Sequence, residues 1–264
     1  MNKRAKQIVR ILQKSFKNEE AVFADTKELL ENQRPRGVRT GSREHANFLF
    51  YLISQDHGTK SAKLYERAKS LYQEHPDLFD PVSVAKTYRS ESDMELATLL
   101  KMLGVRYPNN ATKFWYHNST RLTSEFGGDS RNIFRALGSD VVKTIRSFQG
   151  FGPKIGGLLL RVFVGTGMAN IDEIGEVDFP TDIHDTRIAA LTRIADIPTD
   201  ITELNYSPYV RTAQNVWRSA CREAGADWLE VDRALWILGS KGCVSGRHHD
   251  CPLRAYCIKG DLLL

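Results

Sequence analysis

One lysine and one aspartate each stand where an apolar helical pattern begins. Lys154 lies in QGFGPKIGGLLLRVF (149–163), between a Gly-Phe-Gly-Pro turn and a run of leucines. An amine at a helix N-terminus meets the positive end of the helix dipole, and partial burial would favour its neutral, nucleophilic form. A lysine here can also contact a backbone phosphate without covalent chemistry. Asp182, in PTDIHDTRIAALTRI (180–194), stands where an N-cap is expected.

The turn before Lys154 predicts an anion site. The segment DVVKTIRSF (140–148) reads as a short amphipathic helix, QGFG (149–152) as a tight turn whose glycines allow positive φ, and Pro153 as the first residue of the next helix. The backbone N–H groups of such a turn and of the following helix N-terminus suit a nucleic-acid phosphate. Glycine turns between helices also occur for packing alone.

All four cysteines fall within residues 221–264, at positions Cys221, Cys243, Cys251 and Cys257. This clustering is typical of a metal site in an intracellular protein. Two segments, 215–224 and 228–239, read as an antiparallel helix pair, which places Cys221 beside the start of the second helix and Cys243 beyond its end. About twelve helical residues separate those points by roughly 18 Å, so Cys221 is not expected to share ligands with Cys243.

Helical periodicity dominates the rest of the chain, and strand signals are almost absent. Breaks with Gly, Pro or Asx residues separate the helical segments, for example at 75–83, 105–110 and 175–180. The sequence contains no internal repeat. It therefore predicts an all-α protein of about ten short helices.

Charge is distributed in blocks. Residues 1–45 hold eleven Lys/Arg against six Asp/Glu, and residues 101–170 hold ten against three, whereas 171–205 hold nine acidic residues against two arginines. Such basic faces favour a polyanionic partner, although ordinary solvated helix faces would also give a high pI. No apolar stretch is long enough to span a membrane, and residues 1–16 lack the apolar core of a secretory signal. These features predict an intracellular protein with no membrane contact.

The order of GFGPKIGGLLL and PTDIHDTRI resembles the helix-hairpin-helix (HhH-GPD) DNA glycosylases, whose mark is a G-x-G-x-K hairpin followed by a V-D-x-H-x-x-R-like segment. Upstream, FLFYLISQDHGT and LLKMLGVRYPNNATKF are similar to segments of the endonuclease III-like members that enter the duplex. Downstream, WILGSKGC and DCPLRAYC resemble their iron-sulfur tail. The resemblance covers roughly residues 45 to 260.

This resemblance implies that Lys154 attacks C1′ of a flipped nucleotide, expels the base and forms a Schiff base that can break the strand. It implies that Asp182 accepts a proton and stabilises positive charge on the sugar. About ten extra residues, MANIDEIGEV (168–177), separate the hairpin helix from Asp182, and several are acidic. We expect this insertion to line the base pocket or to face solvent.

The resemblance also predicts DNA contacts away from the lysine. Gln55 would fill the gap left by the flipped base, within a register uncertainty of one residue, or simply end a helix. A wedge loop would replace lost stacking with Val105, Arg106 and Tyr107, and the hairpin would hold a phosphate with Gly150, Phe151 and Gly152. Trp115 and Tyr116 could stack on a base, but aromatic residues at helical spacing favour a place in the core.

In the tail, Cys243, His248, Cys251 and Cys257 are the expected ligands of a [4Fe-4S] cluster. The family pattern is C-x6-C-x2-C-x5-C, whereas here Cys243 and Cys251 are separated by seven residues and His248 stands in place of the missing cysteine. Zinc is the alternative, because a Cys3His set also suits it. His249 could replace His248, and a metal-free tail with buried thiols stays open.

The sequence thus predicts a two-lobed α-helical DNA glycosylase with AP lyase activity, acting on double-stranded DNA as a monomer in the cytoplasm, associated with the nucleoid. Residues 45–169 would form the hairpin domain, and residues 1–44 would form an arm packing with 170–264. A monofunctional glycosylase that activates water and a non-catalytic DNA-binding protein are the alternatives. The excised base is open between oxidised, mismatched, deaminated, alkylated and phage-type modified bases, so a role in repair or in defence against modified foreign DNA is open too.

Overall fold

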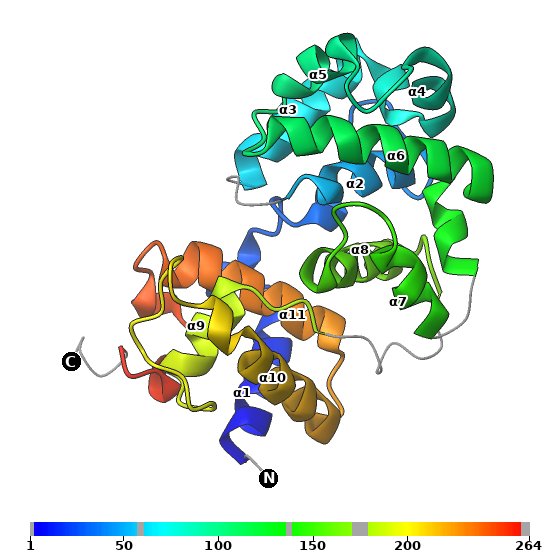
Figure 1. Ribbon diagram of the computed structural model, residues 1–264. Helices are drawn as coiled ribbons and strands as arrows, with labels where there is room; N and C mark the ends of the chain where they lie inside the picture. Colours follow the sequence, from blue (N-terminus) through cyan, green and yellow to red (C-terminus); the bar gives the residue numbers. More distant parts are fainter. Residues whose placement is uncertain (1–2, 57–60, 136–138, 171–178, 260–264) are drawn as a thin grey trace. The chain divides into compact units, whose positions relative to one another are not determined.

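Every regular element of the chain, as far as the structure describes it, is a helix (Figure 1). The computed structural model describes residues 3–56, 61–135, 139–170 and 179–259. The α-helices of the N-terminal half are α1 (Lys3–Lys17), α2 (Arg43–Ser54), α3 (Ser61–Glu74), α4 (Pro81–Thr87), α5 (Met94–Lys101) and α6 (Pro108–Phe126). Those of the C-terminal half are α7 (Ser139–Arg146), α8 (Pro153–Gly165), α9 (Ile183–Leu191), α10 (Val210–Ala224) and α11 (Trp228–Ile237). The all-α prediction is therefore confirmed, and none of these helices has the length and apolar character that a membrane span needs.

Two compact units divide the chain. Unit 1 comprises Met1–Leu29 and Asp178–Leu264, and unit 2 comprises Leu30–Val177. Residues 30–44, which the sequence assigned to the N-terminal arm, belong to unit 2. Two ion pairs tie them there: Arg161 on α8 bonds Glu31 at 3.1 Å with both side chains buried, and Arg43 bonds Asp80 at 2.8 Å.

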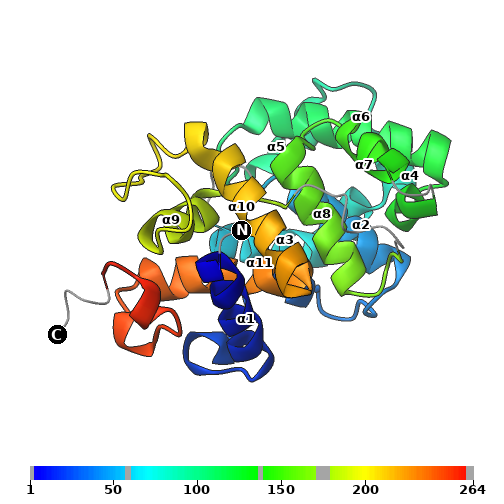
Figure 2. The same cartoon turned by 90° about the horizontal axis from the view of Figure 1, so that it is seen from below.

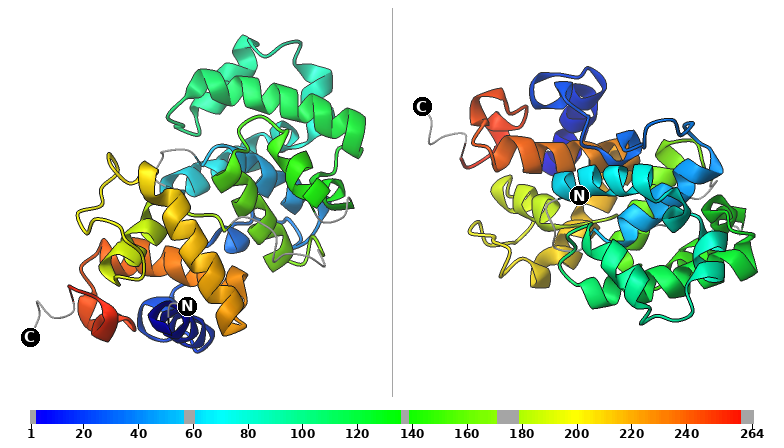
Figure 3. Two further views of the ribbon diagram at one scale, coloured as in Figure 1. Left: turned by 60° about the horizontal axis from the view of Figure 1, so that its bottom comes forward. Right: turned by 90° about the horizontal axis from the view of Figure 1, so that it is seen from above.

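In unit 1 the N-terminal helix packs on the C-terminal helices. The apolar face of α1 buries Ile8, Val9 and Leu12 against α10 and α11, because these residues recur at helical spacing. Arg4 donates from its guanidinium to the backbone oxygens of Thr192 and Tyr256, at 2.8 and 2.7 Å. Both panels of Figure 3 show α1 beside the C-terminal loop that Arg4 holds.

In unit 2 a central helix is surrounded by the others. Ten of the twelve residues of α2 are buried, and the ring of Tyr51 stacks on Trp115 of α6 with centroids 4.3 Å apart. The longest helix of this unit, α6, runs alongside α4 and α5 (Figure 2). This packing makes α6 the element that connects the outer helices with the hairpin.

Several sequence breaks prove to be helix starts. The segment 75–83, predicted as a break, contains a 3₁₀ turn (Pro76–Phe79) followed directly by α4. Asp80 caps α4 by accepting from the Ser83 N–H, and Pro81 occupies its first turn, where a missing N–H costs nothing. The same proline placement starts α6 and α8. Proline and Asp therefore delimit these helices without making loops of them.

Candidate nucleic-acid interface

The hairpin of unit 2 connects α7 and α8, which lie side by side (Figure 1). At its first glycine the backbone has φ +87°, a conformation that residues with a side chain rarely adopt. A Cβ at Gly150 would also lie 2.9 Å from Cδ2 of Phe114 and 3.3 Å from the Ser54 oxygen. The fold of unit 2 therefore requires glycine at this position.

The second glycine has a different explanation. Gly152 is the N-cap of α8 with φ −69°, so it does not use the positive φ that a glycine allows. Any residue could adopt its conformation, and a Cβ placed there would meet nothing within 4 Å. A glycine at this position leaves the N-terminus of α8 uncovered, where the first N–H groups of a helix have no partner within the helix.

Phe151, between the glycines, belongs to the core. Its side chain is buried, with ring centroids 4.8 Å from Phe50 and 6.2 Å from Phe148, and its N–H donates to the Phe148 oxygen. The ring thus anchors the hairpin, and the predicted DNA contact of Phe151 would have to use backbone atoms.

Lys154 occupies the second position of α8 and is exposed. The partial burial that would favour a neutral amine is therefore not found at this position. The dipole of α8 still acts on the Lys154 amine, because the residue lies in the first turn of that helix.

A cavity of about 450 Å³ lies in unit 2 beside the hairpin. It is lined by residues of three segments that are distant in sequence: Gln55; Val105, Arg106, Tyr107, Asn110 and Phe114; Arg146, Phe148, Gly150, Phe151 and Gly152. The structure thus brings together all seven residues that the sequence proposed as DNA contacts. Aromatic rings and two arginines give this cavity the composition of a surface that binds stacked or unstacked bases and phosphates.

The predicted wedge loop forms the exposed rim of the cavity. Tyr107 is 52% exposed and precedes α6 as its N-cap, and the Arg106 guanidinium lies 5.4 Å from the centre of its ring. Gln55 is only 5% exposed at the end of α2, where its amide nitrogen donates to Ser54 Oγ at 2.9 Å. The loop therefore offers an exposed ring and cation, whereas Gln55 offers little of its surface.

The sequence prediction missed four residues of this cavity. Asn110 and Phe114 follow Tyr107 at three and seven residues, which is the spacing of one helix face, so this periodicity could have revealed them. Arg146 ends α7 four residues before Gly150, and Phe148 follows it. Trp115, by contrast, is buried and donates to the Leu78 oxygen at 2.7 Å, which confirms its predicted place in the core. Tyr116 is half-buried and does not line the cavity.

In unit 1, Asp182 caps α9. Its Oδ1 accepts from the His184 N–H at 2.7 Å, and its own N–H donates to Oδ2 of Asp185 at 2.7 Å, which completes a capping box. Asp182 is half-buried. The predicted N-cap is therefore present, with a carboxylate held in a fixed orientation.

A π-helical turn (Leu238–Cys243) continues α11 and packs against α9. The contact is close because Gly239 has no side chain: a Cβ there would lie 2.4 Å from that of His184. This turn ends at Cys243, so one segment of unit 1 supports the helix that Asp182 caps and also begins the cysteine loop.

The cysteines separate into a group and an outlier. Burial, with smaller effects of the charges of Cys251 and Cys257, raises the pKa of the Cys243 thiol to about 12. The pKa of Cys221, a buried residue of α10, is raised to about 12 by burial and then by Asp232 and Asp227. After burial, the charges of the other two loop thiols raise the pKa of Cys243, whereas the charges of Asp232 and Asp227 raise that of Cys221.

Cys243, Cys251 and Cys257 are half-buried, as is His248, while His249 is exposed. A Cys3His set has donor chemistry that suits iron-sulfur or zinc. Across the described residues, however, no three His, Cys, Asp or Glu side chains are positioned to hold a metal ion. The chemistry of the loop fits a metal, but its described geometry does not form a closed site. The acidic insertion, residues 168–177, lies for the most part outside the described residues.

Two solved structures share the fold over nearly the whole chain. A thermostable thymine-DNA glycosylase is 12% identical, with a TM-score of 0.59 and 98% of each chain covered. Endonuclease III, in a trapped covalent intermediate with DNA, is 13% identical, with a TM-score of 0.61 and 97% of each chain covered. No protein-family model matches the chain, and no curated protein is similar to it in sequence.

The structural likeness establishes the class to which the architecture belongs. The chain has the all-helical fold of the endonuclease III-like, helix-hairpin-helix DNA glycosylases. Within that fold, its hairpin and wedge loop line one cavity, and its capped aspartate begins α9.

Proposed function

We propose that this protein is a DNA glycosylase that extrudes a damaged or modified base from duplex DNA and excises it, with AP lyase activity through Lys154. The observation that carries the proposal is the cavity of unit 2. Residues chosen from the sequence as DNA contacts come from three segments and line this one cavity.

Each part of the cavity has a role in this proposal. The N-terminus of α8, left uncovered by Gly152, binds a phosphate next to the target nucleotide. Arg106 and Tyr107 enter the stack where the base has left it, because an aromatic ring or a guanidinium can replace the lost stacking. Arg146 supplies a further positive charge for the backbone.

The chemical step begins at the lysine. The unprotonated Nζ of Lys154 attacks C1′, the N-glycosidic bond breaks, and the base leaves with the bonding electrons and takes up a proton. The ring of the sugar then opens to a Schiff base, and β-elimination of the 3′ phosphate breaks the strand. The exposure of Lys154 makes its amine accessible to a sugar held by the hairpin.

Asp182 is proposed to accept a proton during base release and to stabilise the cationic sugar. Its hydrogen bond to the His184 N–H fixes the direction of the carboxylate. Capping α9 does not by itself require an aspartate, because asparagine is an equally good N-cap and lacks the charge. The proposed chemistry uses the charge, which capping does not need.

One observation favours a second candidate. Because Lys154 is exposed, burial gives no help in keeping its amine neutral before DNA binds. In the second candidate, a monofunctional glycosylase, Asp182 activates a water molecule and Lys154 contributes only positive charge.

We further propose that Cys243, His248, Cys251 and Cys257 hold a [4Fe-4S] cluster, with zinc as the alternative. Cys221 lies within α10, outside the loop that carries the other three cysteines, which supports this choice of ligands. The metal would fix the fold of the loop, and no step of base excision is assigned to it.

Borohydride trapping tests the proposed lysine chemistry. Wild-type protein is incubated with a duplex that carries an abasic site, and with a panel of duplexes that each carry one class of modified base. Reduction should yield a covalent protein–DNA adduct, and Lys154→Gln should abolish it while keeping DNA binding. Lys143→Gln is the matched control, because Lys143 is an exposed lysine of α7 next to the same hairpin.

Asp182→Asn should keep the fold and DNA binding but lose about a hundredfold or more in base release, since it removes a proton acceptor and a charge from the transition state. Base release by Lys154→Gln at the wild-type rate would replace the lyase proposal with the monofunctional candidate. DNA binding with no base release from any duplex would contradict both.

A further inference from the structure

Asn118 of α6 makes a reciprocal pair of hydrogen bonds with the hairpin. Its Nδ2 donates to the Gln149 oxygen at 2.9 Å, and its Oδ1 accepts from the Gln149 N–H at 2.9 Å. The side chain is 2% exposed. Both bonds at once require a donor and an acceptor, which the amide of Asn118 provides on two separate atoms of one short side chain.

Two further residues of α6 contact the hairpin on the same helix face. Phe114, one turn before Asn118, lies against Gly150. Arg121, one turn after it, donates to Ser147 Oγ at 2.7 Å and places its guanidinium 4.4 Å from the centre of the Phe148 ring. Positions 114, 118 and 121 of α6 therefore contact positions 150, 149 and 147 of the hairpin, so the sequence of the hairpin runs opposite to that of the helix along this contact.

The same helix begins directly after the wedge loop. Tyr107 is the N-cap of α6, eleven residues before Asn118, which corresponds to about 16 Å along the helix axis. One rigid element thus carries the wedge loop at its start and is bonded to the hairpin near its middle.

We infer that Asn118 is a positioning residue, which fixes the phosphate-binding hairpin at a set distance from the wedge loop through α6. The inference rests on the proposed function, since it assumes that hairpin and wedge bind one DNA duplex. Asn118 does not line the cavity, so its effect on DNA must pass through the backbone of Gln149.

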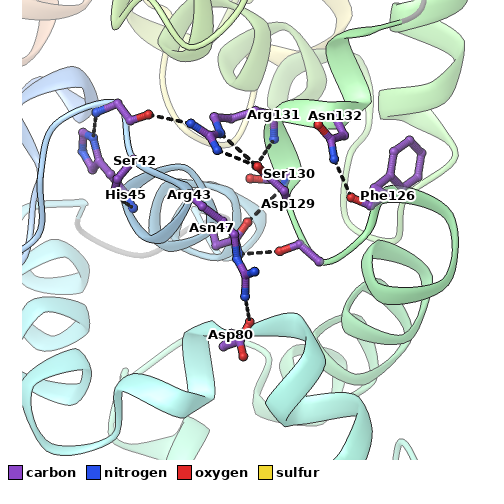
Figure 4. Close-up of polar contacts among 12 residues, drawn as sticks. Ser42, Arg43, His45, Asn47, Asp80, Phe126, Asp129, Ser130, Arg131 and Asn132 are labelled. Atoms are coloured by element: carbon purple, nitrogen blue, oxygen red, sulfur yellow. Dashed lines mark hydrogen bonds and ion pairs between the residues drawn. The ribbon is translucent and has the colours of Figure 1, made fainter.

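Unit 2 offers a matched control in Asn47. This residue is 1% exposed, and its Nδ2 donates to the Gly128 oxygen at 2.9 Å. Its Oδ1 accepts from the Ser130 N–H at 2.9 Å (Figure 4). Asn47 therefore holds a turn of the same unit by the same chemistry, and neither it nor that turn lines the cavity.

The test compares Asn118→Asp with Asn47→Asp. An aspartate keeps the acceptor and loses the donor, so both variants should lower the melting temperature by similar amounts. Binding is measured at several salt concentrations, to an intact duplex and to a duplex with a tetrahydrofuran abasic analogue. Asn118→Asp should weaken binding to the analogue about tenfold and flatten the slope of log K against log salt by about 0.9, the loss of one phosphate contact.

Asn47→Asp should bind both duplexes within about twofold of wild type at every salt concentration, since it changes no phosphate contact. Equal losses in the two variants, or an unchanged salt slope in Asn118→Asp, would overturn the inference and leave DNA binding in place. A wild-type protein without salt-dependent DNA binding would overturn the proposed function and the inference together.

If Asn118→Asp does not fold, Arg121→Met decides the question. This variant removes the bond to Ser147 and the cation beside Phe148 from a partly exposed side chain. It should fold and bind the analogue about threefold more weakly, as expected for one of several contacts that fix the hairpin. Wild-type affinity and salt slope in Arg121→Met would then overturn the inference.

Discussion

The hairpin of unit 2 and the cysteine loop of unit 1 were both predicted from a resemblance in sequence, yet they differ in how far the chain alone organises them. In the hairpin, glycine at 150, a buried ring at 151 and the amide of Asn118 fix the backbone. In the loop, the three cysteines are half-buried, and no closed metal site forms among the described residues.

The difference follows from what each region would bind. A phosphate site made of backbone N–H groups needs only a fixed backbone, which hydrogen bonds and packing inside the protein can supply. A thiolate site gathers negative charges, so its closure requires the metal cation. The comparison therefore predicts a DNA site that is formed in advance and a cysteine loop that depends on its metal.

The largest expected effect concerns the metal. Protein purified without oxygen should be yellow-brown and contain iron, and Cys251→Ser should remove the colour and the metal, because a cluster needs its thiolate ligands. Cys221→Ser should keep both, because Cys221 is buried in α10 beside carboxylates. Metal analysis and visible absorption spectra provide the measurement.

A colourless protein with one zinc per chain would replace the cluster with the alternative metal. Metal loss in Cys221→Ser with retention in Cys251→Ser would contradict the proposed ligand set, and the contrast between the two regions would then need another explanation.

The two hairpin glycines should respond in opposite ways. Gly150→Ala forces a side chain into positive φ and against Phe114, so it should destabilise the protein by about 1–3 kcal/mol. Gly152→Ala has room and an ordinary φ, so its stability cost should be about 1 kcal/mol or less. Its main effect should be on DNA, because the added methyl group covers the N-terminus of α8.

Thermal unfolding and DNA titration separate these effects. If Gly152→Ala bound DNA with wild-type affinity, the N-terminus of α8 would not be part of the DNA-binding site. A Gly150→Ala variant as stable as wild type would show that the hairpin is less fixed than the comparison requires.

The smallest expected effect is a pH dependence of unit 2. Burial lowers the pKa of His45 below its usual value, and the bond between its Nε2 and the Gln33 oxygen opposes this only in part. The His45 ring takes up a proton near pH 6.5 in the unfolded chain and only at a lower pH in the folded protein. Stability that is present above pH 6.5 is therefore lost as the pH falls below that value. Unfolding by denaturant at several pH values should show this loss, and His45→Gln should reduce it. An identical pH dependence in His45→Gln would exclude His45 as its source.

Much of this fold could be predicted from the sequence because it depends on local patterns. Helical periodicity predicted the all-α class, and Gly, Pro and Asx residues marked the separations between helices, although the stretch before α4 was predicted as a break. Residues 30–44, which the sequence analysis assigned to the N-terminal arm, belong to unit 2, where the Arg161–Glu31 pair joins residues 130 apart in the sequence.

The candidate site was predictable only in part for the same reason. The family resemblance identified seven of the eleven residues that line the cavity, and helix spacing from Tyr107 could have added Asn110 and Phe114. The core position of Phe151 depends on its packing against Phe50 of α2, and the bonds of Asn118 to Gln149 depend on the packing of α6 against the hairpin. Such contacts between distant segments leave no periodic signal in one sequence.

We propose that the cavity of unit 2 binds DNA from which a base has been extruded. Measuring the affinity of Tyr107→Ala for two duplexes tests this directly. Tyr107 is half-exposed on the rim of the cavity, so the substitution should leave the fold intact. Affinity for a duplex with an abasic analogue should be about tenfold weaker, because a stacking side chain is lost, and affinity for the intact duplex should change by less than about twofold. Equal changes on the two duplexes, or none on either, would contradict it.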